Sequence, residues 1–135
     1  MAGQVEVMFA SDVASRALGM ELLRAGPGMA EVRMRITRAM VNGFDIAHGG
    51  YLFMLADTAF ACACNSDGQV TVAAGAEISF VTSARLGDEL VATAELRTRY
   101  GRNGIYDVTI RRDRDIIAEF RGRSRATNTA APEVP

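Results

Sequence analysis

Apolar and polar residues alternate along five stretches of this chain, and one further stretch is apolar almost throughout. Alternation with a period of two is typical of strands that bury one face. Turn-forming segments separate the last four of these predicted strands. The apolar stretch runs from Gly49 to Cys64 and predicts a helix that is buried on most of its circumference. The predicted strands cover residues 30–40, 69–80, 88–99, 105–112 and 116–124.

The order of these elements predicts the fold class. A short helix over 11–19, capped by Ser11 and ended by Gly19, precedes the first strand. One long helix followed by consecutive strands favours an α+β domain with a mostly antiparallel sheet. Only the 49–64 helix is large enough to cover the apolar face, so we expect the sheet to wrap around this central helix. Because so small a sheet has exposed edges, we also expect oligomerisation.

Composition narrows the class of protein. The chain has 135 residues, of which 49% are apolar and 23% charged, and its net charge is −1. These values fit one domain, predicted over residues 1–125, and give no reason to expect a nucleic-acid or membrane partner. The N-terminus lacks the features of a signal peptide, so we expect a cytoplasmic protein. The small, polar segment 126–135 is predicted to be a disordered tail.

The two cysteines, Cys62 and Cys64, lie two positions apart on the predicted helix. That spacing puts them on nearly opposite sides, which excludes a shared disulfide or metal ion. We expect both to be small buried apolar residues. With one histidine in the chain and no cluster of ligands, we expect no metal site.

A single carboxylate, Asp57, interrupts the apolar helix. On a helical wheel it shares a stripe with Phe53, Phe60 and Cys64, and no basic residue lies within four positions of it. An ionised carboxylate in such surroundings costs free energy unless it has a partner. It could still point to solvent or cap a buried backbone amide, but the unusual start of the same helix favours a functional role.

That start reads His48-Gly49-Gly50. The first amides of a helix have no partner within it and carry the positive end of its dipole. Two glycines leave the approach free of side chains, so a carbonyl oxygen could bind the Gly49 amide and become an oxyanion there. Taken alone, this segment could equally be an ordinary helix start with a loop histidine, and Asn42 with Gly43 an ordinary turn.

The separation of the two groups suggests how they would cooperate. Asp57 lies about 12 Å along the helix axis from Gly49. One carboxylate and one oxyanion donor at that distance cannot share a reacting carbon. An Asp57 from a second subunit could close the gap, which indicates a site at a subunit interface.

The combination of motifs resembles the hotdog-fold acyl-CoA thioesterases, among them the phenylacetyl-CoA thioesterases of bacterial phenylacetate degradation. The motifs are "NG", "HGG", "LADTAFA" and "ACNS", followed by "ISF", "GD.L.A.A", "G.YDV.I" and "A.FRG.S". The resemblance implies a sheet wrapped around a central helix, dimers joined edge to edge, and a homotetramer built as a dimer of dimers. It also implies an acyl-CoA substrate and no cofactor, because CoA is part of the substrate.

The resemblance implies roles for individual residues as well. Asp57 would be the catalytic carboxylate, which either activates water or attacks directly to give a mixed anhydride. The Gly49 amide would bind the thioester carbonyl oxygen, and Gly50 would lie next to the substrate. The carboxylate of the same site would come from another subunit. Asn42 and His48 would orient or polarise that carbonyl. Candidates for binding the CoA phosphates are Arg102 and Arg123.

Two positions depart from the family pattern. Many relatives have a serine or threonine where this chain has Ala74, near the attacking water. After "ISF", where Arg-Pro is frequent, the chain reads Val81-Thr82-Ser83. Both departures leave the carboxylate and the oxyanion donor in place.

The expected function is hydrolysis of an aryl-acetyl-CoA such as phenylacetyl-CoA or a hydroxylated relative. One alternative is a hotdog module that binds acyl-CoA without catalysis. A second is a hotdog dehydratase, which needs an acid and a base at Cα–Cβ. The position of His48 at the helix start suits polarisation of a carbonyl better.

Overall fold

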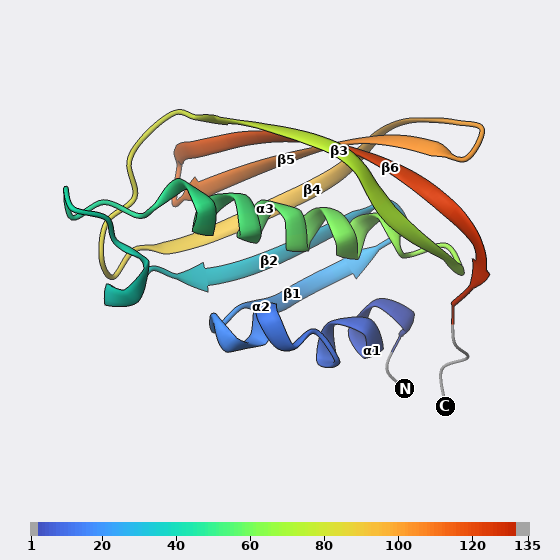
Figure 1. The fold of residues 1–135 in the computed structure, drawn as a ribbon, viewed down its shortest axis with the longest axis horizontal. Helices are drawn as coiled ribbons and strands as arrows, with labels where there is room; N and C mark the ends of the chain where they lie inside the picture. Colours follow the sequence, from blue (N-terminus) through green and yellow to red (C-terminus); the bar gives the residue numbers. More distant parts are fainter. Residues whose placement is uncertain (1–2, 132–135) are drawn as a thin grey trace.

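The fold is a six-stranded antiparallel sheet that curves around one long helix, α3 (Figure 1). The structure, a computed structural model, describes residues 3–131. The strand order is β1-β2-β4-β5-β6-β3, and every neighbouring pair is antiparallel. The elements are α1 (Gln4–Ala10), α2 (Val13–Ala17), β1 (Glu21–Gly26), β2 (Met29–Arg35), a 3₁₀ turn η1 (Arg38–Met40), α3 (Gly49–Cys64), β3 (Gln69–Phe80), β4 (Glu89–Tyr100), β5 (Asn103–Arg112) and β6 (Asp115–Ala130).

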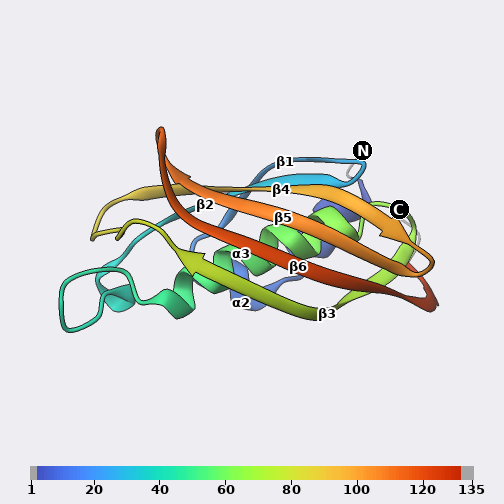
Figure 2. The ribbon, with the colours of Figure 1, turned by 90° about the horizontal axis from the view of Figure 1, so that it is seen from above.

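The core lies between α3 and the concave face of the sheet. Figure 2 shows the strands passing over the helix along its whole length. Alternate residues of β2, β4 and β5 are buried, and they pack with the sheet-facing residues of α3. This confirms the predicted α+β architecture with a central helix. The largest of the fully buried side chains are Tyr106, Phe60, Met34, Ile36, Leu55, Leu90, Ile110 and Ile117.

Strand β3 covers the predicted residues 69–80, but its inner face changes partway along. Its pairing with β6 shifts between Ala73 and Gly75, so Ala74 is an extra, bulged residue. A bulge of one residue moves every later side chain to the other face. Uniform alternation over the predicted 69–80 strand would place Val72 and Ile78 on one face, and the bulge shows that this expectation is wrong. Val72 pairs with Arg125 and is 49% exposed, whereas Ile78 packs on the core.

The N-terminal segment differs most from the prediction. Helix α1 and strand β1 were not predicted, because neither carries a regular apolar pattern. Helix α2 was predicted, but Asp12 caps it instead of Ser11: its side chain accepts the N–H of Ser15. Strand β2 ends at Arg35, and the last residues of the predicted 30–40 strand form η1.

The predicted disordered tail is wrong for residues 126–130. These residues continue β6, where Ala130 pairs with Gln69 of β3 and the Thr127 hydroxyl donates to the Val70 carbonyl at 2.7 Å. Composition suggested disorder, but backbone pairing with a neighbouring strand does not need apolar side chains. The rest of the predicted tail, 132–135, lies outside the described residues.

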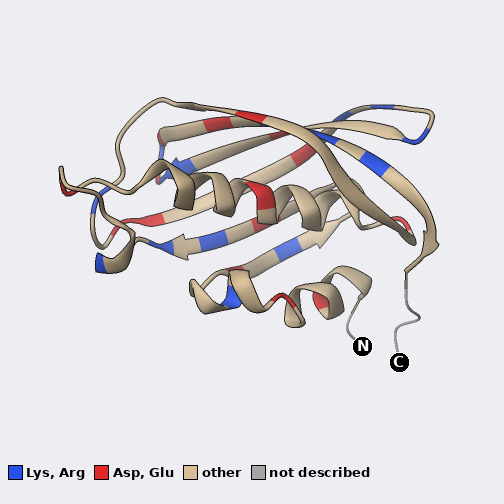
Figure 3. Ribbon diagram, viewed as in Figure 1, with Lys and Arg blue, Asp and Glu red and all other residues tan. Residues whose placement is uncertain are grey.

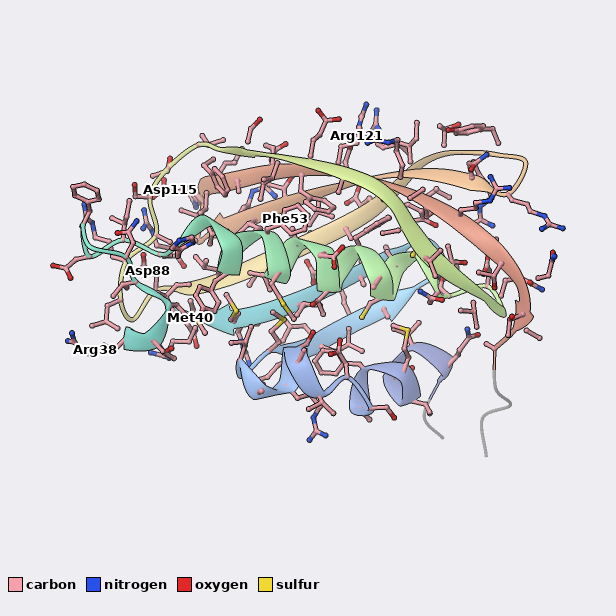
Figure 4. The ribbon with its side chains drawn as sticks, viewed as in Figure 1. Arg38, Met40, Phe53, Asp88, Asp115 and Arg121 are labelled. Atoms are coloured by element: carbon pink, nitrogen blue, oxygen red, sulfur yellow. The ribbon has the colours of Figure 1, made fainter. Side chains whose placement is uncertain are left out.

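Charged residues lie on the strands, the turns and the two short helices, while α3 carries a single acidic residue and no basic one (Figure 3). On the outer face of the sheet, Arg121 points away from the helix and forms two hydrogen bonds to Asp107, at 2.7 and 2.9 Å (Figure 4). Within residues 3–131, no helix has the length and apolar character needed to cross a membrane.

Candidate active site

Helix α3 begins at Gly49, and His48 is its N-cap. The Nδ1 atom of His48 accepts the N–H of Gly50 at 3.2 Å, and the His48 carbonyl accepts the N–H of Tyr51 at 3.0 Å. Because a ring nitrogen that accepts carries no proton, Nε2 is left as the donor of the His48 ring in this arrangement. Of the first three amides of α3, the Gly49 N–H is the one without a partner among the described residues. The helix start therefore offers one free backbone donor.

A cavity of about 280 Å³ opens beside this donor. The ring of Phe80 closes one side so tightly that a Cβ added to Gly49 would lie 2.7 Å from its Cζ atom. A side chain at position 49 would push the Phe80 ring away from the helix start. The other walls are mainly apolar, and Asn42, Thr82 and Ser83 are the polar residues among them. The lining residues are Asn42, Ile46, Ala47, Gly49, Leu52, Phe80, Val81, Thr82, Ser83 and Ala84.

Asn42 has a fixed orientation at this cavity. Its Oδ1 atom accepts the amides of Phe44 at 2.9 Å and Ile46 at 3.4 Å, which closes the turn that leads to α3. With the oxygen held by the turn, the amide nitrogen has no partner within residues 3–131. Asn42 therefore has N–H groups that are free within this part of the chain, and its role toward a bound carbonyl stays a prediction.

Asp57 lies at the border between the buried and open faces of α3. Phe60 is buried on one side, while Phe53 is 36% exposed. The Phe53 side chain points toward the sheet, where the centroid of its ring lies 5.3 Å from that of Phe120 (Figure 4). The Asp57 carboxylate has neither a hydrogen bond nor an ion pair within the described chain, so it caps no amide. Burial, and secondly the charge of Asp12, raise the pKa of Asp57. A half-buried carboxylate with a raised pKa and no partner is suited to accept a proton.

One chain does not bring the two groups together. Asp57 lines neither the Gly49 cavity nor the larger cavity at the other end of α3. The two residues stand eight positions apart on one straight helix, which gives about 12 Å along its axis. The geometry therefore agrees with a site that a second subunit completes.

The two predicted phosphate-binding arginines lie elsewhere. Arg102 is at the β4–β5 turn and lines a polar cavity of about 490 Å³, together with Arg99, which already contacts Asp67 at 3.0 Å. Arg123 lies on the outer face of β6, with its Nη1 atom 3.5 Å from Glu77. Neither arginine lines the Gly49 cavity, and their roles remain predictions.

The cysteines behave as predicted. Both are free and buried, and burial raises the pKa of Cys62 and of Cys64 to about 12. Thiols with such pKa values are protonated at neutral pH and poor nucleophiles. Among residues 3–131, no three His, Cys, Asp or Glu side chains form a group that could hold a metal ion.

Sequence reasoning missed two features of the site. Ala74 is the bulged residue of β3 and does not line the Gly49 cavity, whereas Thr82 and Ser83, from the segment that departs from the family pattern, do. The second feature is a buried polar contact between Ser15 and Thr58, next to Asp57. Asp12 lies three positions before Ser15, which is the spacing of a helix cap. This spacing could have predicted the contact between Asp12 and Ser15.

Comparison with known proteins agrees with the predicted family. The thioesterase superfamily matches residues 44–118. Acyl-coenzyme A thioesterase PaaI of Escherichia coli is 42% identical over 118 residues, which cover 87% of this chain and 84% of that protein. The structure of E. coli PaaI, from the phenylacetic acid degradation operon, matches with a TM-score of 0.91 and 39% identity over 94% of this chain and 93% of the other.

A phenylacetic acid degradation protein PaaI from Thermus thermophilus matches with a TM-score of 0.83 and 29% identity, over 86% of this chain and 100% of the other. Sequence, fold and the free amide at the start of α3 thus point the same way. The chain belongs to the thioesterase superfamily and has its hotdog fold.

Proposed function

We propose that this thioesterase hydrolyses the thioester of an aryl-acetyl-CoA, such as phenylacetyl-CoA or a ring-hydroxylated relative, to the free acid and CoA. The observation that carries the proposal is the unpaired Gly49 amide, which opens on a mainly apolar cavity of about 280 Å³. An apolar cavity of about 150 Å³ already accommodates benzene, so this one has room for a ring and its methylene. The names of the PaaI relatives support the same substrate class.

The residues supply the parts that thioester hydrolysis needs. The carbonyl oxygen binds the Gly49 N–H, with Asn42 Nδ2 and His48 Nε2 as further donors, and these stabilise the negative charge that develops on it. Asp57 takes a proton from water as the water oxygen attacks the carbonyl carbon. The carbon–sulfur bond then breaks, and the CoA thiolate leaves and takes up a proton. Direct attack by Asp57, with hydrolysis of the resulting anhydride, uses the same donors.

We further propose that Asp57 of the partner subunit completes each site. Strand β3 ends the sheet order, so one of its edges has no strand partner within residues 3–131. An edge of 12 residues is a template for pairing with a second copy. Pairing of two β3 strands would place two α3 helices near each other in opposite directions. The start of each helix would then meet the middle of the other, and two such dimers would form the predicted tetramer.

The proposed reaction uses no metal ion or added cofactor, since CoA enters with the substrate. The cytoplasmic location remains a prediction.

A thiol-release assay tests the proposal. The purified protein is given phenylacetyl-CoA, its ring-hydroxylated relatives, and short and long fatty acyl-CoAs, and free CoA is measured with a thiol reagent. We expect turnover of all small acyl-CoAs and a preference of roughly tenfold or more in kcat/KM for the aryl-acetyl substrates. Tight binding of acyl-CoA without thiol release would support the non-catalytic module instead. Conversion of a β-hydroxyacyl-CoA to an enoyl-CoA without thiol release would support the dehydratase.

A further inference from the structure

A buried chain of hydrogen bonds joins α2 to α3 at the turn that carries Asp57. The Ser15 hydroxyl lies 2.7 Å from Asp12 Oδ2 and 2.8 Å from the Thr58 hydroxyl. Ser15 is 1% and Thr58 6% exposed. A carboxylate only accepts, so the Ser15 proton goes to Asp12 and the Thr58 proton goes to Ser15. Both hydroxyl groups therefore donate in the same direction along this series of hydrogen bonds, and the last acceptor is the Asp12 carboxylate.

The chain holds the Asp12 carboxylate in one place. Its second oxygen, Oδ1, accepts the Ser15 N–H at 3.0 Å as the cap of α2. The basic residue of the same helix, Arg16, donates to the Ala10 carbonyl at 3.0 Å and forms no ion pair with Asp12. Asp12 thus keeps an unneutralised negative charge two hydrogen bonds away from Thr58, the residue that follows Asp57.

We propose that Asp12 is a positioning residue for the catalytic base: the Thr58–Ser15–Asp12 chain fixes a negative charge at the turn of α3 that carries Asp57 and so promotes proton transfer from water to Asp57. The inference rests on the proposed function, because it concerns the carboxylate that activates water. A like charge held near a carboxylate favours its protonated form, and a base with greater proton affinity takes a proton from water more readily.

Among the described residues, Asp12 is the charged group that acts on the pKa of Asp57. Burial is the larger cause of the raised pKa of Asp57, and the charge of Asp12 is the second. Glu6 of α1 acts on the pKa of Cys62, farther along the helix. The charge of Asp57 contributes to the raised pKa of Cys64, and the Cys64 thiol is uncharged at neutral pH. The buried strand residues that pack under α3 are apolar, apart from Ser124 of β6.

Two measurements on the whole protein test the proposal. The first is the pH at which Asp57 titrates, followed by the carboxyl ¹³C signal and assigned with Asp57→Asn. The second is the acid limb of kcat/KM for phenylacetyl-CoA. Asp12→Asn retains a good helix cap but not the charge. We expect both transitions to move to lower pH by about half a unit, because removal of the like charge lowers the pKa of Asp57.

Matched variants separate charge from structure. Glu6→Gln removes an acid from the neighbouring helix α1 and should leave both transitions in place. Asp12→Ser provides a second uncharged cap and should reproduce the shift seen with Asp12→Asn. Ser15→Ala breaks the chain while it keeps the charge, and should give a smaller shift.

If both Asp12 variants fold and Asp57 titrates as in the parent, the inference is overturned. A parent protein that releases no thiol would refute the proposed function, but the ¹³C titration would still show whether the two carboxylates are coupled. The two failures are therefore distinguishable.

Discussion

The start and the middle of α3 hold the two halves of the proposed site, and they are built in different ways. At the start, the cap by His48, the turn at Asn42 and the free Gly49 amide all arise from residues 42–50. In the middle, the surroundings of Asp57 depend on α2, through a contact between Ser15 and Thr58 that spans 43 positions in sequence. The donor half is thus built from one local segment, whereas the acid half depends on contact with a helix that is distant in sequence.

This difference predicts how each half responds to change. Substitutions at the helix start should affect the oxyanion and leave the titration of Asp57 unaltered. Substitutions around Asp57 should alter proton transfer and its pH dependence. The variants below are arranged from the largest expected effect to the smallest.

Asp57→Asn should have the largest effect. The amide has nearly the same shape but cannot accept the proton of water or attack the carbonyl, so kcat should fall by roughly 10²–10⁴-fold. Acyl-CoA binding and the oligomeric state should stay as in the parent, checked by calorimetry and light scattering. Parental turnover by Asp57→Asn would show that the base lies elsewhere.

Gly49→Pro tests the other half by removal of its N–H. Gly49 is the first residue of α3, where proline is tolerated, and His48 has a ψ of 134°, which suits a residue before proline. Gly49→Ala is the matched control: it crowds Phe80 in the same way but keeps the N–H. We expect Gly49→Pro to lower kcat by roughly 10²–10³-fold relative to Gly49→Ala in steady-state assays. Equal rates for the two variants would remove Gly49 as the oxyanion donor.

Substitution of Asn42 should have a moderate effect on activity. Two variants separate its contribution to the turn from its contribution to substrate binding. Asn42→Asp keeps the oxygen that accepts from Phe44 and Ile46 but loses the Nδ2 donors. It should lower kcat roughly tenfold with little change in Tm. Asn42→Ala also loses the turn, so its Tm should fall by a further amount that corresponds to about 1 kcal/mol. If Asn42→Asp retains full kcat, Asn42 has only a structural role.

The smallest effect concerns stability. The folded-state pKa of Asp57 is raised above the ordinary value of 3.8, so Asp57 contributes most to stability below that pH. The contribution is lost as the pH rises through the raised pKa, because the folded protein must then hold a half-buried charge. The free energy of unfolding of Asp57→Asn, measured with denaturant, should therefore increase relative to the parent as the pH rises from 4 to 7. A difference that does not change with pH would contradict the raised pKa.

The same contrast explains what the sequence could predict. The alternating strands and the apolar helix depend on local patterns, and α3, β3, β4 and β5 appear close to the expected positions, whereas β2 ends at Arg35 instead of residue 40. The bulge at Ala74 and the extension of β6 to Ala130 depend on pairing between strands, which no local pattern encodes. The contact between Ser15 and Thr58 needs α2 to cross α3, so the sequence identified Asp57 but not the charge that acts on it.

The central claim is that each active site combines the Gly49 amide of one chain with Asp57 of the partner subunit. It is tested most directly by co-expression of Asp57→Asn and Gly49→Pro chains with different affinity tags and assay of the mixed oligomer. In a shared site, half of randomly formed dimers are mixed and each has one intact site, so activity should return to about a quarter of the parental value. No recovery above the separate variants, in oligomers shown to contain both chains, would contradict the account.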